Sequence, residues 1–174
     1  AHYWLRQHLG TDVVWINGMM NVIISENLHD RQFVEARTEG FDALKKVVEK
    51  YTPDYVEKIS GIPQQHLKEA ARLYAKAKAG SICYCMGITQ HIAGTDNVKS
   101  LANLAMLCGH MGIEGGGVNP LRGQNNVQGA CDMGGLPNVF SGYQPVTDLS
   151  IVKKMEDAWG VSGLPTKVGL TVTQ

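Results

Sequence analysis

Hydrophobic positions recur at helical spacing along most of the first 110 residues. The clearest case starts at Asp12 and continues to about residue 27, where an apolar side chain returns every three or four positions. Gly18 lies inside this stretch at a cost of about 1 kcal/mol relative to alanine, which indicates close packing against a neighbour. The same spacing predicts further helices at 30–37, 40–51, 52–61, 63–78, 97–110 and 150–159. Thr52 is expected to cap the helix at 52–61, and Thr95 or Asp96 the helix at 97–110.

Few stretches have the pattern of a strand. Residues 81–86 form a short apolar run bounded by glycine, which predicts a buried strand, and residues 2–7 resemble the end of another. The order of helix, strand, glycine loop and buried helix is typical of α/β layers. We therefore predict a helix-rich α/β fold, a Rossmann-like three-layer αβα sandwich. Because a stable sheet needs more than two strands, either the sheet is completed elsewhere or some strands escape the pattern.

The charge balance narrows the possible partners. Sixteen basic residues offset sixteen acidic ones in 174 residues, which leaves no long-range field for nucleic acid or an anionic membrane. No apolar run approaches the roughly 20 residues of a membrane helix. The four cysteines lack CxxC spacing and the histidines lack HxH or HxxxH spacing, so no metal site is predicted. The cysteines are expected to be small buried hydrophobes in a reducing compartment.

The segment 117–134, GVNPLRGQNNVQGACDMG, has neither helical nor strand periodicity. It is rich in glycine and side-chain amides, and Arg122 is its single cation. Loops this long and polar are usually functional or disordered, and in an apolar chain we expect a functional one. A guanidinium is a planar fork that matches a carboxylate or phosphate, so Arg122 is a candidate for binding a small carboxylate or an anionic cofactor. The alternative is an ordinary arginine in a solvated loop.

A second candidate site follows the predicted strand at 81–86. In open α/β sheets, ligands bind beyond the carboxyl ends of the strands, close to helix N-termini. Met86, Gly87, Gln90 and Thr95 would lie at that edge. Neither GxGxxG nor GxxxxGK[ST] occurs in the chain, so NAD and P-loop sites lose their main support. An ordinary turn between strand and helix is the alternative.

Asp12 is a third candidate, at the start of the first predicted helix. Thr11 or Asp12 is in place to cap that helix. The Asp12 carboxylate is also suited to read guanine, because it can accept hydrogen bonds from N1 and N2 together, a pair that adenine does not offer. No nucleophile–base pair and no pair of carboxylates for acid–base work stands out. The chain is expected to bind and orient a ligand but not, alone, to react.

The run GVNPLRGQNNVQGACDMG resembles a loop of molybdenum- or tungsten-dependent formate dehydrogenase catalytic subunits. These enzymes belong to the bis-molybdopterin-guanine-dinucleotide oxidoreductases. The resemblance spans nearly the whole chain and includes residues 10–12, 86–90, 100–107, 136–137 and 142–143.

The resemblance implies roles for individual residues. Arg122 matches the active-site arginine that orients formate beside the metal. Gln124, together with Gly123, matches a contact to a pterin. Met86 and Gln90 match further cofactor contacts at the edge already identified.

The same resemblance assigns the first turn and the domain boundary. Gly10, Thr11 and Asp12 match the turn that recognises one guanosine end of the cofactor. Residues 1–124 would be the later half of one α/β domain that binds molybdopterin guanine dinucleotide, and 125–174 the start of the adjoining α/β domain with an extended tail. The family's cysteine or selenocysteine metal ligand has no match here, and it is expected upstream together with a [4Fe-4S] cluster. A fragment of this kind would explain the incomplete sheet.

The resemblance therefore implies part of a formate dehydrogenase that converts formate to carbon dioxide, or the reverse, at a Mo or W bis-pterin centre. The isolated fragment is expected to be inactive. Expected partners are formate or carbon dioxide, the remainder of the subunit and an electron-transfer subunit, without nucleic acid or a direct membrane span. We expect a cytoplasmic location and leave a periplasmic one open. The alternatives are another bis-pterin oxidoreductase such as a nitrate reductase, and a non-catalytic scaffold or electron-transfer subunit.

Overall fold

The computed structural model describes residues 1–171. The chain forms two compact units. The first unit is Ala1–Leu121 and the second is Arg122–Gln174. This division falls close to the boundary predicted at residue 124, while the assignment of the two parts to two cofactor-binding domains stays a prediction. Residues 172–174 of the predicted tail lie outside the described part of the chain.

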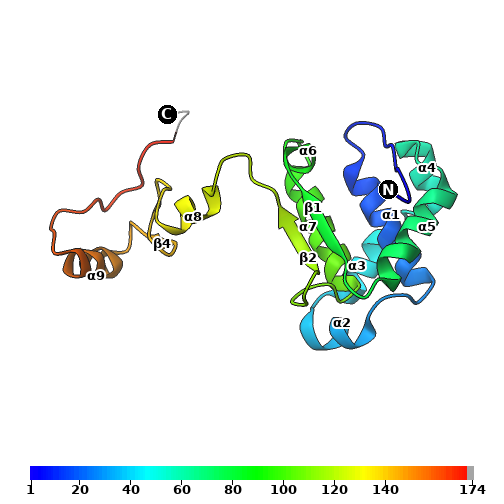
Figure 1. Ribbon diagram of the computed structural model, residues 1–174, viewed down its shortest axis with the longest axis horizontal. Coiled ribbons are helices and arrows are strands. Elements are labelled where there is room, and N and C mark those ends of the chain that lie inside the picture. The colour runs from blue at the N-terminus through cyan, green and yellow to red at the C-terminus, as the bar shows by residue number, and fades with distance from the viewer. Residues whose placement is uncertain (172–174) are drawn as a thin grey trace. The chain divides into compact units, whose positions relative to one another are not determined.

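The first unit is mainly helical, as the hydrophobic spacing predicts (Figure 1). Its elements are α1 (Asp12–Ser25), α2 (Arg31–Arg37), α3 (Phe41–Val48), α4 (Pro53–Ser60), α5 (Gln64–Lys76), β1 (Ser81–Tyr84), α6 (Met86–Thr89), α7 (Gly94–Leu107) and β2 (Gly117–Pro120).

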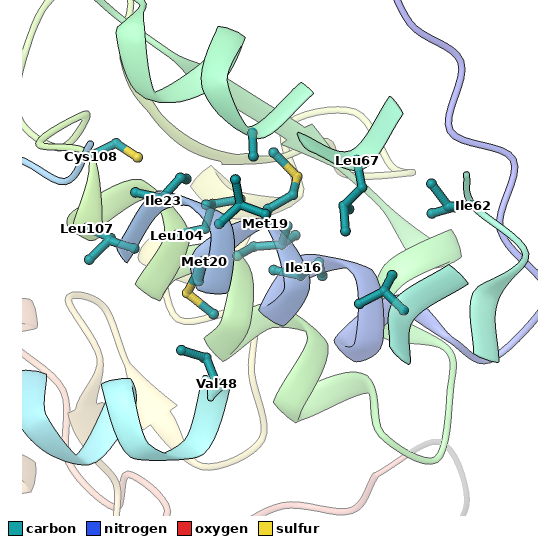
Figure 2. Close-up of a cluster of buried hydrophobic side chains, with 14 of the residues drawn as sticks. Ile16, Met19, Met20, Ile23, Val48, Ile62, Leu67, Leu104, Leu107 and Cys108 are labelled. Carbon is teal, nitrogen blue, oxygen red and sulfur yellow. The ribbon is translucent and has the colours of Figure 1, made fainter. Parts of the chain in front are cut away.

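Helix α1 is the centre of the first unit, because α3, α4, α5 and α7 all pack against it. Ile16, Met20 and Ile23 of this helix are fully buried in the main hydrophobic cluster (Figure 2). A Cβ atom added at Gly18 would stand 2.5 Å from Val56 Cγ2 and 3.1 Å from Leu67 Cδ2. The close packing predicted from this glycine is therefore confirmed, and α4 and α5 are the neighbours that require it.

The helix ends agree with the sequence in part. Thr52 caps α4 as predicted, since its Oγ1 accepts a hydrogen bond from the backbone N–H of Tyr55 at 3.3 Å. The predicted cap of α1 is wrong, because the Thr11 hydroxyl instead donates to the carbonyl of His8 at 2.6 Å. The predicted cap by Thr95 or Asp96 is also wrong, since α7 already begins at Gly94.

The sheet of the first unit consists of β1 and β2, which pair in parallel from Ser81 with Gly117 to Tyr84 with Pro120. Helix α7 packs against both strands, and Ile82 and Tyr84 join the main hydrophobic cluster. Ser81 and Cys83 alternate with them and are exposed, so the prediction of a strand is confirmed but that of a fully buried one is wrong. Residues 2–7 form no strand.

The second unit contains α8 (Val127–Asp132), β3 (Val139–Phe140), β4 (Gln144–Pro145) and α9 (Leu149–Trp159). Strands β3 and β4 form a short antiparallel pair. A small core of Phe140, Val146, Val152 and Met155 joins this pair to α9. Residues 161–171 are in neither helix nor strand.

The segment 117–134 is more regular than the sequence indicates. Strand β2 and helix α8 lie within it, so the prediction of a stretch without regular structure is wrong. A strand of four residues is too short to show alternation, and β2 is defined by its pairing with β1, far away in the sequence. The prediction of a helix-rich α/β class is confirmed, with two small sheets of two strands each in the described part of the chain. No helix among residues 1–171 is long and apolar enough to cross a membrane.

Candidate cofactor-binding edge

Beyond the carboxyl end of β1 the chain turns at once into the short helix α6. The side-chain amide of Asn97 in α7 donates to the carbonyl of Ile88 at 2.9 Å, and Asn97 itself is buried. A Cβ atom at Gly94 would collide with the carbonyl oxygen of Thr89. A glycine at the start of α7 and an asparagine one turn later therefore hold α6 against the N-terminus of α7.

The predicted contact residues Met86 and Gln90 lie at the two ends of α6, where the backbone N–H of Gln90 donates to the carbonyl of Met86 at 2.9 Å. Met86 is 56% exposed, and Gln90 is exposed as well. Apart from Gly87 itself, its two chain neighbours and the backbone of α6, no described atom lies within 4 Å of the place that a Cβ would take at Gly87. This edge is thus open to a ligand, and a ligand can approach its backbone closely.

The turn before α1 brings Gly10 and Asp12 to the start of that helix. Gly10 has a φ of +76°, a left-handed conformation that favours glycine. The Asp12 side chain is almost fully buried, and its Oδ1 accepts a hydrogen bond from Gln7 Nε2 at 3.2 Å. Its Oδ2 lies 3.7 Å from His91 Nε2. Asp12 therefore faces other side chains, and its carboxylate is not used to cap α1.

His91 joins the Asp12 turn to α6. Its Nε2 also lies 2.9 Å from the carbonyl oxygen of Gly87, so the same ring nitrogen faces both segments. The structure thus brings the predicted guanine-reading turn and the residues of α6 into one region of the first unit. His91 was not among the predicted site residues, because no sequence spacing links it to Asp12. Gly94 and Asn97 were missed for the same reason.

Arg122, Gly123 and Gln124 are exposed at the start of the second unit. In this unit the Asp132 carboxylate beside the Tyr143 hydroxyl raises the pKa of that tyrosine, and the charge of Arg122 acts in the opposite direction. Tyr143 has a φ of 58°, which is rare for a residue with a side chain. Arg122 is therefore close enough to Tyr143 for its charge to act on that hydroxyl.

The cysteines do not assemble into a metal site. Among residues 1–171 no group of three or more His, Cys, Asp or Glu side chains could hold a metal ion. Burial raises the pKa of the Cys108 thiol to about 12, as expected for a small buried hydrophobe. Cys83 is exposed, so the expectation of burial is wrong for this residue, which lies on the outer face of β1.

Comparison with known proteins identifies the family. The profile of the molybdopterin oxidoreductases matches residues 1–171. The chain belongs to the molybdopterin oxidoreductase family. The resemblance inferred from the motifs is therefore confirmed, and membership implies a molybdopterin cofactor.

Several relatives of this molybdopterin oxidoreductase chain are named as formate dehydrogenases. It is 54% identical to the F420-dependent formate dehydrogenase subunit alpha of Methanocaldococcus jannaschii. The 165 aligned residues are 95% of this chain and 24% of that relative. It is 49% identical over 165 residues to formate dehydrogenase H of Escherichia coli, and this alignment covers 95% of the chain and 23% of the relative. The chain thus spans about a quarter of the length of these relatives.

A solved structure in this family has a different activity in its name. Acetylene hydratase from Pelobacter acetylenicus superposes with a TM-score of 0.64 and 30% identity, over 66% of this chain and 16% of that one. A shared molybdopterin oxidoreductase fold therefore does not fix the reaction, and an argument about activity must come from site residues and from more similar relatives.

Proposed function

We propose that this chain is part of the catalytic subunit of a formate dehydrogenase, which oxidises formate to carbon dioxide or catalyses the reverse. One observation carries the proposal. Relatives named as formate dehydrogenases are about half identical to the chain over 95% of its length, which includes the Arg122 segment. The cofactor of the whole enzyme would be bis-molybdopterin guanine dinucleotide with Mo or W, and that metal centre would supply the acceptor for the electrons of formate.

The exposed edge at α6 is suited to hold part of that cofactor. Met86 and Gln90 present exposed side chains at the two ends of the helix, and Gly87 between them leaves the backbone accessible. In the second unit, Gly123 and Gln124 would contact a pterin, and the Gln124 side chain offers an amide that donates and accepts hydrogen bonds. These residues fit a ligand rich in hydrogen-bonding groups better than they fit a metal ion.

The turn of Gly10, Thr11 and Asp12 would recognise one guanine end. A carboxylate accepts hydrogen bonds with both oxygens, so Asp12 can pair with N1–H and N2–H of guanine together. Gly10 supports this role because a Cβ placed there would meet no neighbouring segment within 4 Å, so there is room beside the turn.

Arg122 would hold the carboxylate of formate. Its guanidinium carries a fixed charge and a planar set of donors, which suits a small planar anion. In a site that excludes water such a group stabilises charge far more than it does in solution. Arg122 is exposed in this chain, so the proposal requires the remainder of the subunit to enclose it.

The wider assembly follows from the same proposal. Residues 1–124 and 125–174 would belong to two adjoining α/β domains of one subunit. A [4Fe-4S] cluster in another part of that subunit would take electrons from the metal centre to an electron-transfer subunit, and the enzyme would work in the cytoplasm. Several relatives are named as alpha subunits, which is consistent with further subunits.

Substitution of Arg122 in the full-length enzyme tests the proposal. We expect Arg122→Ala to lower formate-dependent dye reduction by at least about 100-fold, the usual effect of removing a donor that stabilises charge in an active site. Arg122→Lys keeps the charge but not the planar fork and should recover only part of the activity. Metal and pterin content should stay normal in both variants. Turnover of Arg122→Ala within about tenfold of the parent would contradict the role.

A further inference from the structure

Both oxygens of the carboxylate proposed to read guanine already face other side chains of this chain. Asp12 Oδ1 accepts from Gln7 Nε2 at 3.2 Å, and Asp12 Oδ2 faces His91 Nε2 at 3.7 Å. With 5% of its side chain exposed, Asp12 presents almost no surface to a ligand. A guanine base needs both oxygens, one for N1–H and one for N2–H. The base and the present neighbours therefore compete for the same atoms.

His91 can leave Asp12 without disturbing the core. Its side chain is 30% exposed, and the next residue, Ile92, is fully exposed on the same turn. The turn ends at Gly94, whose N–H donates to the carbonyl of His91, and α7 begins there. The His91 ring therefore lies at the surface of the turn, with solvent on one side into which it can rotate.

The pairing of His91 with Asp12 is weak enough to be exchanged. At 3.7 Å the two groups do not form a hydrogen bond, while the ring nitrogen is in bonding distance of the Gly87 carbonyl at 2.9 Å. The Gly87 carbonyl is thus the nearer partner of the His91 ring nitrogen, and the Asp12 carboxylate the more distant one. The pair thus covers the carboxylate in the absence of a ligand but offers only a small barrier to a base that makes two hydrogen bonds.

We propose that His91 belongs to the guanine end of the dinucleotide site, where it covers the Asp12 carboxylate and gives way when a guanine nucleotide binds. The proposal rests on the proposed function, since it takes Asp12 as the guanine reader. It adds a residue from the turn after α6, so that binding at the guanine end is coupled through the Gly87 carbonyl to the segment that holds Met86 and Gln90. Guanine then replaces His91 at Oδ2 and Gln7 at Oδ1.

The test is nucleotide binding by the full-length protein prepared without its cofactor, with GDP as the probe and ADP as the comparison. We expect His91→Ala and His91→Leu to bind GDP about two- to fivefold more tightly than the parent, because the competing group is gone. Asp12→Asn should lose the preference for GDP over ADP. His66→Ala, which removes an exposed histidine on α5, is the matched control and should bind GDP as the parent does.

Each outcome bears on one of the two claims. GDP affinity that is unchanged or weaker in both His91 variants overturns the role of His91, even where the parent prefers GDP over ADP. Absence of a GDP preference in the parent and in both His91 variants overturns Asp12 as the guanine reader, and the role of His91 with it. A GDP preference that appears only in the His91 variants supports both. Equal thermal midpoints of the parent and the variants establish that the fold is intact.

Discussion

The Asp12 turn (residues 10–12) and the Arg122 segment (residues 122–134) differ in the hydrophobic core that stabilises them. Asp12 is the first residue of α1, and α1 carries Ile16 and Ile23 into the main hydrophobic cluster of the first unit. Arg122 is exposed and begins a unit whose core consists of a few side chains between α9 and the pair of short strands. The binding edge of the first unit is therefore fixed by a large core, whereas the Arg122 segment has little local packing.

Backbone conformation distinguishes the two units less than packing does. Asn126 and Tyr143 in the second unit have positive φ, and so has Asn27 in the first, although none of the three is glycine. Such conformations cost of order 1–3 kcal/mol each and persist where the surroundings impose them, often at functional sites. The proposed cofactor-binding edge thus depends on a large core within its own unit, whereas the residues that follow Arg122 have few buried contacts. Substitutions in the two cores test this difference most directly.

The largest effect is expected in the first core. Ile23 is fully buried in α1, so Ile23→Ala should lower the opening free energy of this helix by about 2–5 kcal/mol. Met155 in α9 is also buried but belongs to the small core, and Met155→Ala should cost about 2 kcal/mol, the low end, because fewer neighbours lose contacts. Hydrogen exchange of peptides from α1 and α9 in the full-length protein measures both.

Two exposed residues are the controls for these substitutions. Leu73→Ala on α5 and Leu149→Ala on α9 should each change the exchange by less than about 0.5 kcal/mol, as usual at the surface. A larger cost for Met155→Ala than for Ile23→Ala would overturn the claim that the first unit has the stronger support.

The features that the sequence predicts well are those set by neighbours in the chain. Helical spacing locates α1, and Gly18 correctly predicts close packing, which the structure shows to be against Val56 and Leu67. Thr52 followed by Pro53 defines the start of α4, because cap and first-turn residues act within a few positions.

The features that the sequence does not predict depend on contacts between distant segments. Strand β2 exists through its pairing with β1, and its residues Gly117 and Pro120 are untypical of a strand. His91 meets Asp12 only after α1 and α7 have packed together, and neither residue has a spacing that signals the other. The predicted roles of the Arg122 segment came from resemblance to a family and remain proposals.

A smaller effect is expected at the start of α4 in the first unit. Thr52 Oγ1 accepts from the Tyr55 N–H, so Thr52→Ala should destabilise α4 by about 1 kcal/mol through loss of this cap. Thr52→Ser keeps the acceptor and is the matched control, with a change of only a few tenths of a kcal/mol expected. Hydrogen exchange in peptides covering residues 53–60 gives the measurement. Equal exchange in the alanine and serine variants would exclude a contribution of the hydroxyl.

The smallest expected effect is a pH dependence of helix stability that α9 of the second unit should show and α4 of the first unit should not. Asp148 caps α9, where its Oδ1 accepts from the Ser150 hydroxyl at 2.6 Å and from the Ser150 N–H at 2.9 Å. These bonds, the hydroxyl first, lower the pKa of Asp148 below its ordinary 3.8. Because the folded-state pKa is the lower one, the stabilisation is complete above the ordinary pKa and is lost as the pH falls through the folded-state value. The Thr52 cap has no such titration.

We therefore expect acid to speed hydrogen exchange in α9 of the parent more than in α9 of Asp148→Asn, after correction for the intrinsic pH dependence of exchange. Asparagine keeps a side-chain oxygen that can accept from the Ser150 N–H, but it does not titrate, so the variant isolates the charge from the cap geometry. Peptides from α4 should show no difference between the two proteins, because the Thr52 hydroxyl stays neutral throughout. An identical acid response of α9 in the parent and in Asp148→Asn would show that the charge of Asp148 does not support this helix, and the small core of the second unit would then be its main stabilising feature.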